Sequence, residues 1–390
     1  MTSAPPTPAS LRQVLLALSV SVVLSACGGG DDESADATAE ALESRASPAA
    51  VVTATSGPAA GYSGSSCSIP SAAWSVNTST PARVVGNGTP ASCTSDAVVA
   101  AVAQGGIVKF NCGPDPVVIT MTKTAKVFNN KPDLVLDGGN KVTLSGGGKL
   151  RLLYQNTCDP NQVYTSSRCD IQDKPHTTVQ NMTLVDGNST GQSYGRGDVY
   201  GGGAIFVRGG SLKVVNSRFF RNQCESTGPD LGGAAIRLMG TSPTTPNYIV
   251  KSTIGGASGY GNSCSNGGAI SGLHASVVTY NTHITHNRAI GYGANPARTG
   301  TPGGGNGGGI YADGNTFKVD LNCTRMANNG ANEGGGAVAY VSNNRTGTMR
   351  IANSLLETNT SGRFETAAYP GVFVLAAPGQ PVVTNSILRH

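Results

Sequence analysis

Apolar and polar positions alternate in short runs, and the same order of runs returns about every 30–40 residues from Leu184 onward. Each repeat contains a glycine-rich step before an apolar strand. The step occurs five times, as Gly202-Gly203-Ala204-Ile205, Gly233-Ala234-Ala235-Ile236, Gly267-Gly268-Ala269-Ile270, Gly307-Gly308-Gly309-Ile310 and Gly335-Gly336-Ala337-Val338. A period of this size predicts a solenoid of stacked coils.

The second half of each repeat is an apolar residue followed three positions later by asparagine. It occurs as Phe219…Asn222, Ile284…Asn287, Met326…Asn329 and Leu356…Asn359. Asparagine tolerates left-handed backbone angles and satisfies turn amides, so we expect these residues to form corners and a hydrogen-bonded ladder. The repeat is imperfect, because Ile254 is followed by Gly255-Gly256-Ala257 and that coil is expected to lack its asparagine.

One repeat supplies three short strands with no helix between them, around Ile205, around Lys213-Val214-Val215 and around Phe219. Three strands per turn with parallel stacking predict an all-β fold, a parallel β-helix. Upstream, residues 94–104 predict a helix. Thr94 or Ser95 can cap it, Asp96 suits its positive end and Gly105-Gly106 ends it. We expect this N-terminal helix to cap the open end of the solenoid.

From about residue 90 to 390, this order of steps and strands resembles the right-handed parallel β-helix, or pectin-lyase-like, superfamily. The Gly-Gly-Ala-Ile and Phe-x-x-Asn segments are similar to polymorphic outer-membrane protein repeats, found in bacterial surface proteins. The resemblance implies a right-handed solenoid whose sites lie on an outer face. We expect the chain to differ from the large repeat adhesins in lacking a C-terminal outer-membrane barrel.

The N-terminus predicts export. A lone Arg12 and a short apolar run, Val14 to Leu24, end in Leu24-Ser25-Ala26-Cys27, which resembles a bacterial lipoprotein signal with lipidation at Cys27. An ordinary secretory signal is the alternative. We predict a signal peptide over 1–26, a disordered acidic tether over 27–60 and the β-helix domain over 61–390. Gly28, in place of aspartate, is typical of lipoproteins sorted to the outer membrane.

Charge separates the tether from the rest. Charged residues are only 13% of the chain, yet residues 61–390 contain nine more basic than acidic side chains, while the tether is acidic. A basic exported domain indicates an acidic partner such as an anionic polysaccharide, although the charge could serve solubility alone. We expect no nucleic acid partner, no membrane contact beyond the lipid anchor, and a monomer.

Eight cysteines follow Cys27, and an exported protein can keep them as disulfides. Cys158 and Cys169 flank a short polar insertion, so they can pair locally. Cys224 and Cys264 fall in corresponding loops of successive coils, about 4.8 Å apart in a parallel stack. Cys323, inside a strand segment, is expected to be a buried free thiol. No spacing resembles a zinc site, so we predict no metal and no cofactor, and calcium has no motif to support it.

Aligning the repeats places basic side chains in two outward columns. The first reads Arg218, Thr253, His283, Arg325, Leu355, and the second reads Arg221, Gly256, His286, Asn328, Thr358. A basic stripe formed by Arg218, Arg221, His283, His286 and Arg325 suits repeated carboxylates or sulfates. The alternative is that these side chains are simply solvated.

β-Helix lyases, which the resemblance brings in, abstract a proton beside a uronate carboxylate while a cation neutralises that carboxylate. His283 or His286 is the candidate base, and Arg218 or Arg325 the candidate cation. Carboxylates offer a rival, hydrolytic site. They are Asp198 in the tripeptide Arg196-Gly197-Asp198, Asp230, Asp313 and Glu333. Turn chemistry explains that tripeptide better than adhesion does.

The sequence thus predicts a surface-anchored lipoprotein whose β-helix binds an anionic polysaccharide and is a candidate for cleaving it by β-elimination. If the protein is an enzyme, a lyase fits better than a hydrolase. The alternative is a non-catalytic, adhesin-like surface protein, as the type of repeat favours.

Overall fold

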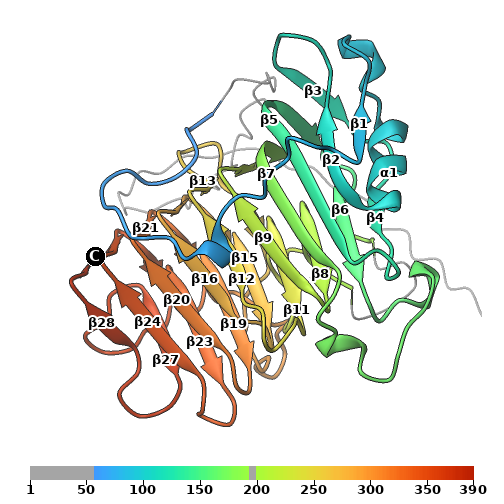
Figure 1. Cartoon of the computed structure of the whole chain (residues 1–390). Helices are drawn as coiled ribbons and strands as arrows, with labels where there is room; N and C mark the ends of the chain where they lie inside the picture. Colours follow the sequence, from blue (N-terminus) through green and yellow to red (C-terminus); the bar gives the residue numbers. More distant parts are fainter. Residues whose placement is uncertain (1–56, 193–198) are drawn as a thin grey trace, which may run out of the picture. The chain divides into compact units, whose positions relative to one another are not determined.

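The computed structural model describes residues 57–192 and 199–390, and within them strands far outnumber helices. The strands form three sheets of 17, 8 and 4 strands, here called sheets A, B and C, in which the strand pairs are parallel. Figure 1 shows the strands following one another in chain order, from blue-green to red. The fold is therefore all-β and parallel, an arrangement consistent with a parallel β-helix-like solenoid.

Sheet A contains two parallel ladders, which are joined because two long strands, β5 (Asp133–Ser145) and β7 (His176–Val185), belong to both. The first ladder also contains β1 (Arg83–Val85), β2 (Gly106–Phe110), β9 (Ser211–Val215), β12 (Asn247–Val250), β16 (Val277–Tyr280), β20 (Lys318–Asn322), β24 (Thr348–Ala352) and β28 (Val382–Thr384). The second also contains β3 (Val117–Thr120), β10 (Arg218–Phe220), β13 (Thr253–Gly255), β17 (His283–Thr285), β21 (Arg325–Ala327), β25 (Leu355–Glu357) and β29 (Ile387–Arg389).

Sheets B and C contain the remaining strands. Sheet B contains β4 (Ala125–Val127), β6 (Leu153–Asn156), β8 (Ile205–Arg208), β11 (Ile236–Met239), β15 (Ile270–Leu273), β19 (Ile310–Gly314), β23 (Val338–Ser342) and β27 (Val372–Leu375). Sheet C contains β14 (Ser263–Cys264), β18 (Arg288–Ala289), β22 (Gly330–Ala331) and β26 (Thr360–Ser361). The three strands predicted for one repeat are β8, β9 and β10. The two-residue strands of sheet C were not predicted, because so short a segment carries no periodicity.

The core is built from aliphatic side chains stacked in register. In sheet B, the first position of successive strands is occupied by Ile205, Ile236, Ile270, Ile310, Val338 and Val372, all fully buried. Burying one such side chain contributes about 1.5–3 kcal/mol. The first glycine of each step lies at positive φ, as at Gly233 (φ 72°) and Gly307 (φ 69°), where a Cβ would meet the carbonyl oxygen three residues on. Glycine is therefore required where the chain enters sheet B.

The asparagines form the predicted ladder, and they are buried. Each side-chain oxygen accepts from the backbone N and from Nδ2 of the preceding asparagine; for Asn287 and Asn329 both distances are 3.0 Å. The ladder runs through Asn222, Asn262, Asn287, Asn329 and Asn359. The expectation that the coil at Ile254 lacks its asparagine was wrong. Asn262 occupies the place, because the loop after β13 (Thr253–Gly255) is longer than in the other repeats and delays the asparagine.

A helix lies where the sequence predicted one. α1 spans Ser95–Gln104, with Thr94 as its N-cap accepting from the amide of Ala97, and Gly105 (φ 68°) as its C-cap. Its apolar face, which includes Val98 and Val102, is buried and contacts β1, β2 and β4. The remaining helical segments described are single turns of 3₁₀ helix, Ser71–Ala73, Pro90–Ser92, Pro160–Gln162 and Cys169–Ile171. Nowhere in residues 57–192 and 199–390 is a helix long and apolar enough to span a membrane.

Residues 57–82, here called the strap, run across the outer face of sheet A before the chain enters β1 (Figure 1). The amide of Tyr62 donates to Asn281 O (2.8 Å), and further along the amide of Val76 donates to Gln180 Oε1 (2.9 Å). Between these points, Ile69 and Ala73 pack on outward apolar side chains of β9, β12 and β16. The predicted end of the tether, at residue 60, thus falls within the strap.

Four disulfides connect the eight cysteines that follow Cys27. The predicted pairs Cys158–Cys169 and Cys224–Cys264 are present, with Cα–Cα distances of 4.9 and 4.8 Å. Cys93 pairs with Cys112. The expectation of a free thiol at Cys323 was wrong, because Cys323 is bonded to Cys67 of the strap, 256 residues earlier. That pairing depends on the path of the strap, which spacing does not reveal.

The asparagine ladder yields a stability prediction. Replacing Asn262 with alanine leaves the buried Nδ2 and amide of Asn222 without their acceptor. We expect Asn262→Ala to lower the free energy of unfolding by about 2–4 kcal/mol. Urea denaturation measures this, with Asn130→Ala, an exposed asparagine outside the ladder, as the matched control. Equal stability of the two variants would contradict a structural role for the ladder.

Candidate functional site

The first predicted basic column exists on the outer face of sheet A. Arg218, Thr253, His283, Arg325 and Leu355 are direct partners across adjacent strands. The side chains of the second column, Arg221 and His286, follow β10 and β17 at bends with positive φ (53° and 61°). The alignment of repeats therefore placed these residues in the correct register.

Two members of the stripe carry charges that the protein already neutralises. Arg221 binds Asp186 through two hydrogen bonds, of 2.8 and 3.1 Å. Arg325 binds Glu357 at 2.7 Å, and Arg389 binds the other oxygen of Glu357 at 2.6 Å. The hydrogen bonds from Arg389 and Arg325 lower the pKa of Glu357. Neither carboxylate was predicted from the sequence, although each lies beside one of the two columns.

His283, the candidate base, is held in its neutral form. Burial, aided by Arg325 and His286, lowers its pKa to about 4. Its Nε2 lies 2.9 Å from Nη1 of Arg325, which carries only hydrogen-bond donors, so Nε2 accepts that bond. The ring of Tyr62, from the strap, lies against it with a centroid distance of 6.3 Å. His286 also has a lowered pKa, mainly because of burial and secondarily because of Arg288.

Arg218 differs from the rest of the stripe. It is half-buried, its Nε donates to Thr183 Oγ1 (2.9 Å), and no carboxylate of the described residues lies within ion-pair distance of it. Burial lowers its pKa, with no anion to offset the effect. Arg218 lines a hollow of about 210 Å³ together with Ala60 of the strap and Asn216. The amide of Asn216 is oriented by Asn140 (2.9 Å) and Asn181 (2.8 Å).

Lys213 is a second half-buried cation with no carboxylate partner among the residues that the structure describes. Its Nζ contacts the carbonyl oxygen of Ala72 in the strap at 3.3 Å, and burial lowers its pKa. It lines a hollow of about 620 Å³, the largest of the three along the strap, together with Tyr248. Between the two cations, a third hollow of about 480 Å³ is bordered by Trp74 and Lys251. The three hollows follow the strap, and we call them together the strap groove.

The rival carboxylates are only partly brought together. Asp230 and Asp313 accept from the same atom, Asn295 Nδ2, at 2.6 and 3.4 Å, so their two oxygens lie no farther apart than the sum of these distances. Glu333 lies elsewhere, buried and bound to both terminal nitrogens of Arg298 (2.8 Å each). The tripeptide with Asp198 falls outside the described residues, as does Cys27.

Beside the Asp230–Asp313 pair lies Arg237, which is 2% exposed. It donates to Ser271 Oγ and to the carbonyl oxygen of Asp230, and burial lowers its pKa to about 10. The phenol of Tyr311 donates to Asp313 (2.8 Å). Because both carboxylates are engaged by donors of the protein, the cluster is explained by the packing of sheet B.

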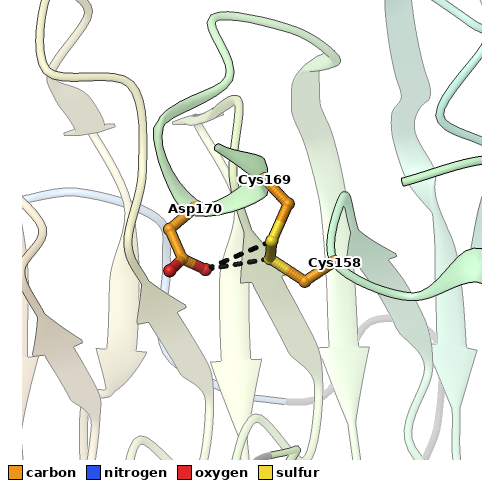
Figure 2. Close-up of side chains that lie close together, drawn as sticks. All are labelled: Cys158, Cys169 and Asp170. Atoms are coloured by element: carbon orange, nitrogen blue, oxygen red, sulfur yellow. Dashed lines mark hydrogen bonds between the residues drawn. A yellow bond between two sulfur atoms is a disulfide. The ribbon is translucent and has the colours of Figure 1, made fainter. Parts of the chain in front are cut away.

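One group of side chains has the composition of a metal site but not its chemistry. Cys158, Cys169 and Asp170 place their sulfur and oxygen atoms close together, as Figure 2 shows. The two sulfur atoms form a disulfide and offer no thiolate, which is the form that binds metals. The carboxylate of Asp170 instead binds Nε of Arg208 at 2.7 Å.

His176, which lines the same hollow as Lys213, was not predicted from the sequence. His176 Nδ1 lies 3.5 Å from Asp133, and its Nε2 lies 3.7 Å from Asp173. The two carboxylates face opposite nitrogens of the ring, so one metal ion cannot bind all three residues as arranged. The signal that could have found His176 is its register, one strand before Ser211 and one after Asp133.

Comparison with known proteins adds no assignment: no family model matches the chain, and no curated protein or solved structure is found to be similar to it.

The neutral state of His283 predicts a pH dependence of stability. Its pKa is 6.5 in the unfolded chain and about 4 in the folded protein, so the unfolded chain binds the proton more readily between these values. The free energy of unfolding should therefore fall as pH decreases from 7.5 to 5, by about 1–2 kcal/mol from this residue.

Urea denaturation of His283→Gln at the two pH values should show a smaller decrease than the unchanged protein does. His274→Asn, at an exposed histidine, is the control and should leave the dependence unaltered. The same decrease in all three proteins would contradict the burial of a neutral His283.

Proposed function

We propose that this chain is a surface-anchored lipoprotein whose strap groove binds an anionic polysaccharide. The parallel stacking supports a right-handed β-helix of the pectin-lyase-like type with polymorphic outer-membrane protein repeats. In this proposal α1, which buries its apolar face on the first strands, caps the solenoid. Lipidation at Cys27 and outer-membrane location rest on the sequence of the signal.

The observation that carries the proposal is the pair of uncompensated cations, Arg218 and Lys213. A half-buried charge without a partner destabilises a protein, because it has lost water and gained no counter-ion. The other arginines of the stripe have carboxylates, so the imbalance is confined to the strap groove. A carboxylate or sulfate bound there would restore the balance, through two parallel hydrogen bonds at the guanidinium.

The form of the groove supports a polymer rather than a small ion. The three hollows follow one another along the strap, and each contains a cation: Lys213, Lys251 and Arg218. Trp74 is 60% exposed, and Tyr248 borders the largest hollow. Aromatic faces beside charged groups can pack on the apolar faces of sugar rings while the cations bind the acidic groups.

His283 favours binding without elimination as the function of the stripe. A general base works best with a pKa near the working pH, whereas the pKa of His283 is lowered to about 4. Its Nε2 already accepts from Arg325, and Arg325 is neutralised by Glu357. The second candidate function, a non-catalytic adhesin-like surface protein, also involves binding without elimination and differs only in its ligand. No cofactor or metal is part of either proposal.

A retention experiment tests the groove. Arg218→Ala should weaken binding of the full chain to alginate about tenfold, and the protein should elute from an alginate column at lower salt. Arg325→Ala is the matched control, because it removes the same single charge from an arginine that Glu357 already pairs, and Glu357 keeps Arg389. Unchanged retention of the double variant Arg218→Ala, Lys213→Ala would reject the groove as the binding site.

An activity screen tests cleavage separately. The full chain is incubated with a panel of uronates, and the absorbance of the unsaturated product is followed. We expect no product and unaltered polymer length, because His283 is neutral but poorly basic. Product that forms with the unchanged protein and disappears in His283→Ala would establish elimination and overturn the non-catalytic reading.

A further inference from the structure

The outward face of the first ladder of sheet A places an aspartate, a histidine and a serine on three adjacent strands. Asp133 on β5 is the direct partner of His176 on β7, and His176 is the direct partner of Ser211 on β9. Adjacent strands lie about 4.8 Å apart, so consecutive side chains of this column can reach each other. The register continues this column through Pro246, Ser276 and Lys318, so the repeat does not require an aspartate or a histidine at this position.

Alternation along the strands shows that all three point away from the core. Leu134 and Leu212, the next residues along β5 and β9, are core side chains. Because neighbouring residues of a strand face opposite sides, Asp133 and Ser211 face outward. Asp133, His176 and Ser211 all line the hollow of about 620 Å³, with Ala72 and Val76 of the strap on its border.

The histidine is oriented as a base would be. Its Nδ1 lies 3.5 Å from Asp133 Oδ1, so a carboxylate holds this nitrogen. The opposite nitrogen, Nε2, is buried and makes no hydrogen bond in the described part of the chain. The nearest carboxylate on that side is Asp173 at 3.7 Å. That distance, to Asp173 Oδ2, exceeds a hydrogen bond, and the other oxygen, Oδ1, is held by the hydroxyls of Ser242, Thr244 and Thr245 at 2.8, 3.2 and 3.4 Å.

Ser211 is a hydroxyl without a partner among the described residues. It is 5% exposed, and its side chain borders the hollow. The amide of Ser211 donates to the carbonyl oxygen of Pro175, which fixes the serine beside the strand that carries His176. No hydrogen bond joins Ser211 Oγ to His176 Nε2 in this structure, but the two groups lie on adjacent strands and line the same hollow. A serine, an imidazole and a carboxylate on the other side of the ring are the groups that together activate serine as a nucleophile, and such contacts often tighten only when substrate binds.

We propose that Asp133, His176 and Ser211 form an ester-hydrolysing site in the largest hollow of the strap groove. Ser211 Oγ attacks the ester carbonyl carbon, and its proton passes to His176 Nε2. The bond between that carbon and the alcohol oxygen breaks, and the alcohol leaves with the proton from His176. Water, deprotonated by His176, then attacks the acyl carbon of the acyl–Ser211 ester. The bond from that carbon to Ser211 Oγ breaks, Oγ takes back the proton from His176, and the carboxylic acid is released. Asp133 is a positioning residue.

Lys213 supplies the electrostatic part of this site. It is two residues beyond Ser211 on the same face of β9, and it lines the same hollow without a carboxylate partner. The oxyanion that forms when Ser211 attacks the carbonyl carbon is a developing negative charge. A desolvated ammonium group stabilises such a charge better than water does.

The substrate class follows from the groove. An O-acylated anionic saccharide would place its acidic groups against the cations and its ester in the hollow of His176; this choice of substrate rests on the proposed function, whereas the ester chemistry does not. A small ester and an acylated polymer therefore test different parts of the proposal.

Covalent labelling tests the nucleophile. A fluorophosphonate probe should label the folded full chain at Ser211, as located by mass spectrometry of the labelled peptide. Ser211→Ala should abolish labelling, and His176→Ala should slow it at least about 100-fold. Ser79→Ala, at an exposed serine of the strap, is the control and should be labelled normally. Absence of labelling in the unchanged, folded protein, or labelling at another residue, would overturn the assignment.

Kinetics test the roles and the substrate. Asp133→Asn should lower kcat for p-nitrophenyl acetate and move the pH profile, which a merely structural change would leave in place. Acetate release from O-acetylated alginate should fall in Arg218→Ala, because the polymer extends to the hollow that Arg218 lines. Hydrolysis of the small ester without release from the polymer would reject the saccharide ester. If the unchanged protein hydrolyses the small ester but does not bind alginate, the proposed function alone would be rejected.

Discussion

Each strand of this protein must match its parallel neighbour in register, and that single constraint explains most of the structure. Parallel strands in sheets A, B and C form their backbone hydrogen bonds only if equivalent residues of adjacent strands lie directly beside each other. The buried asparagines enforce this register, since each oxygen accepts from both the amide and the side chain of its neighbour. A shift by one residue would break the asparagine ladder and turn the aliphatic stack of sheet B outward.

The same register brings like charges together, and the protein manages them unequally. His283 and Arg325 are direct partners on adjacent strands. Repulsion between them is avoided because the ring of His283 is neutral and Glu357 binds Arg325. Among the described residues, no carboxylate lies within ion-pair distance of Arg218 or Lys213. The asymmetry matters because the strap covers both regions, yet only one retains hollows lined by unpaired cations.

The repeat made the strands, the aliphatic core, the asparagine ladder and the register of the basic columns predictable, because all of these recur. The features that could not be predicted are those that depart from the repeat. Asn262 is displaced by a longer loop, and Glu357 neutralises Arg325 from the following coil. The strap has no periodicity, so neither its path nor the Cys67–Cys323 bond could be inferred. The column of Asp133, His176 and Ser211 was missed because the repeats were aligned only around the asparagine step.

The strap also determines how mechanical load would enter the fold. The chain before residue 57 continues into the strap, and the first covalent link between the strap and the coils is Cys67–Cys323. Tension applied from the N-terminus therefore reaches the loop between β20 and β21 before it reaches β1. The first strand, whose parallel pairing with β2 would separate one hydrogen bond at a time, is shielded from that pull. A protein held by its N-terminus in this way would resist being unwound from its first coil.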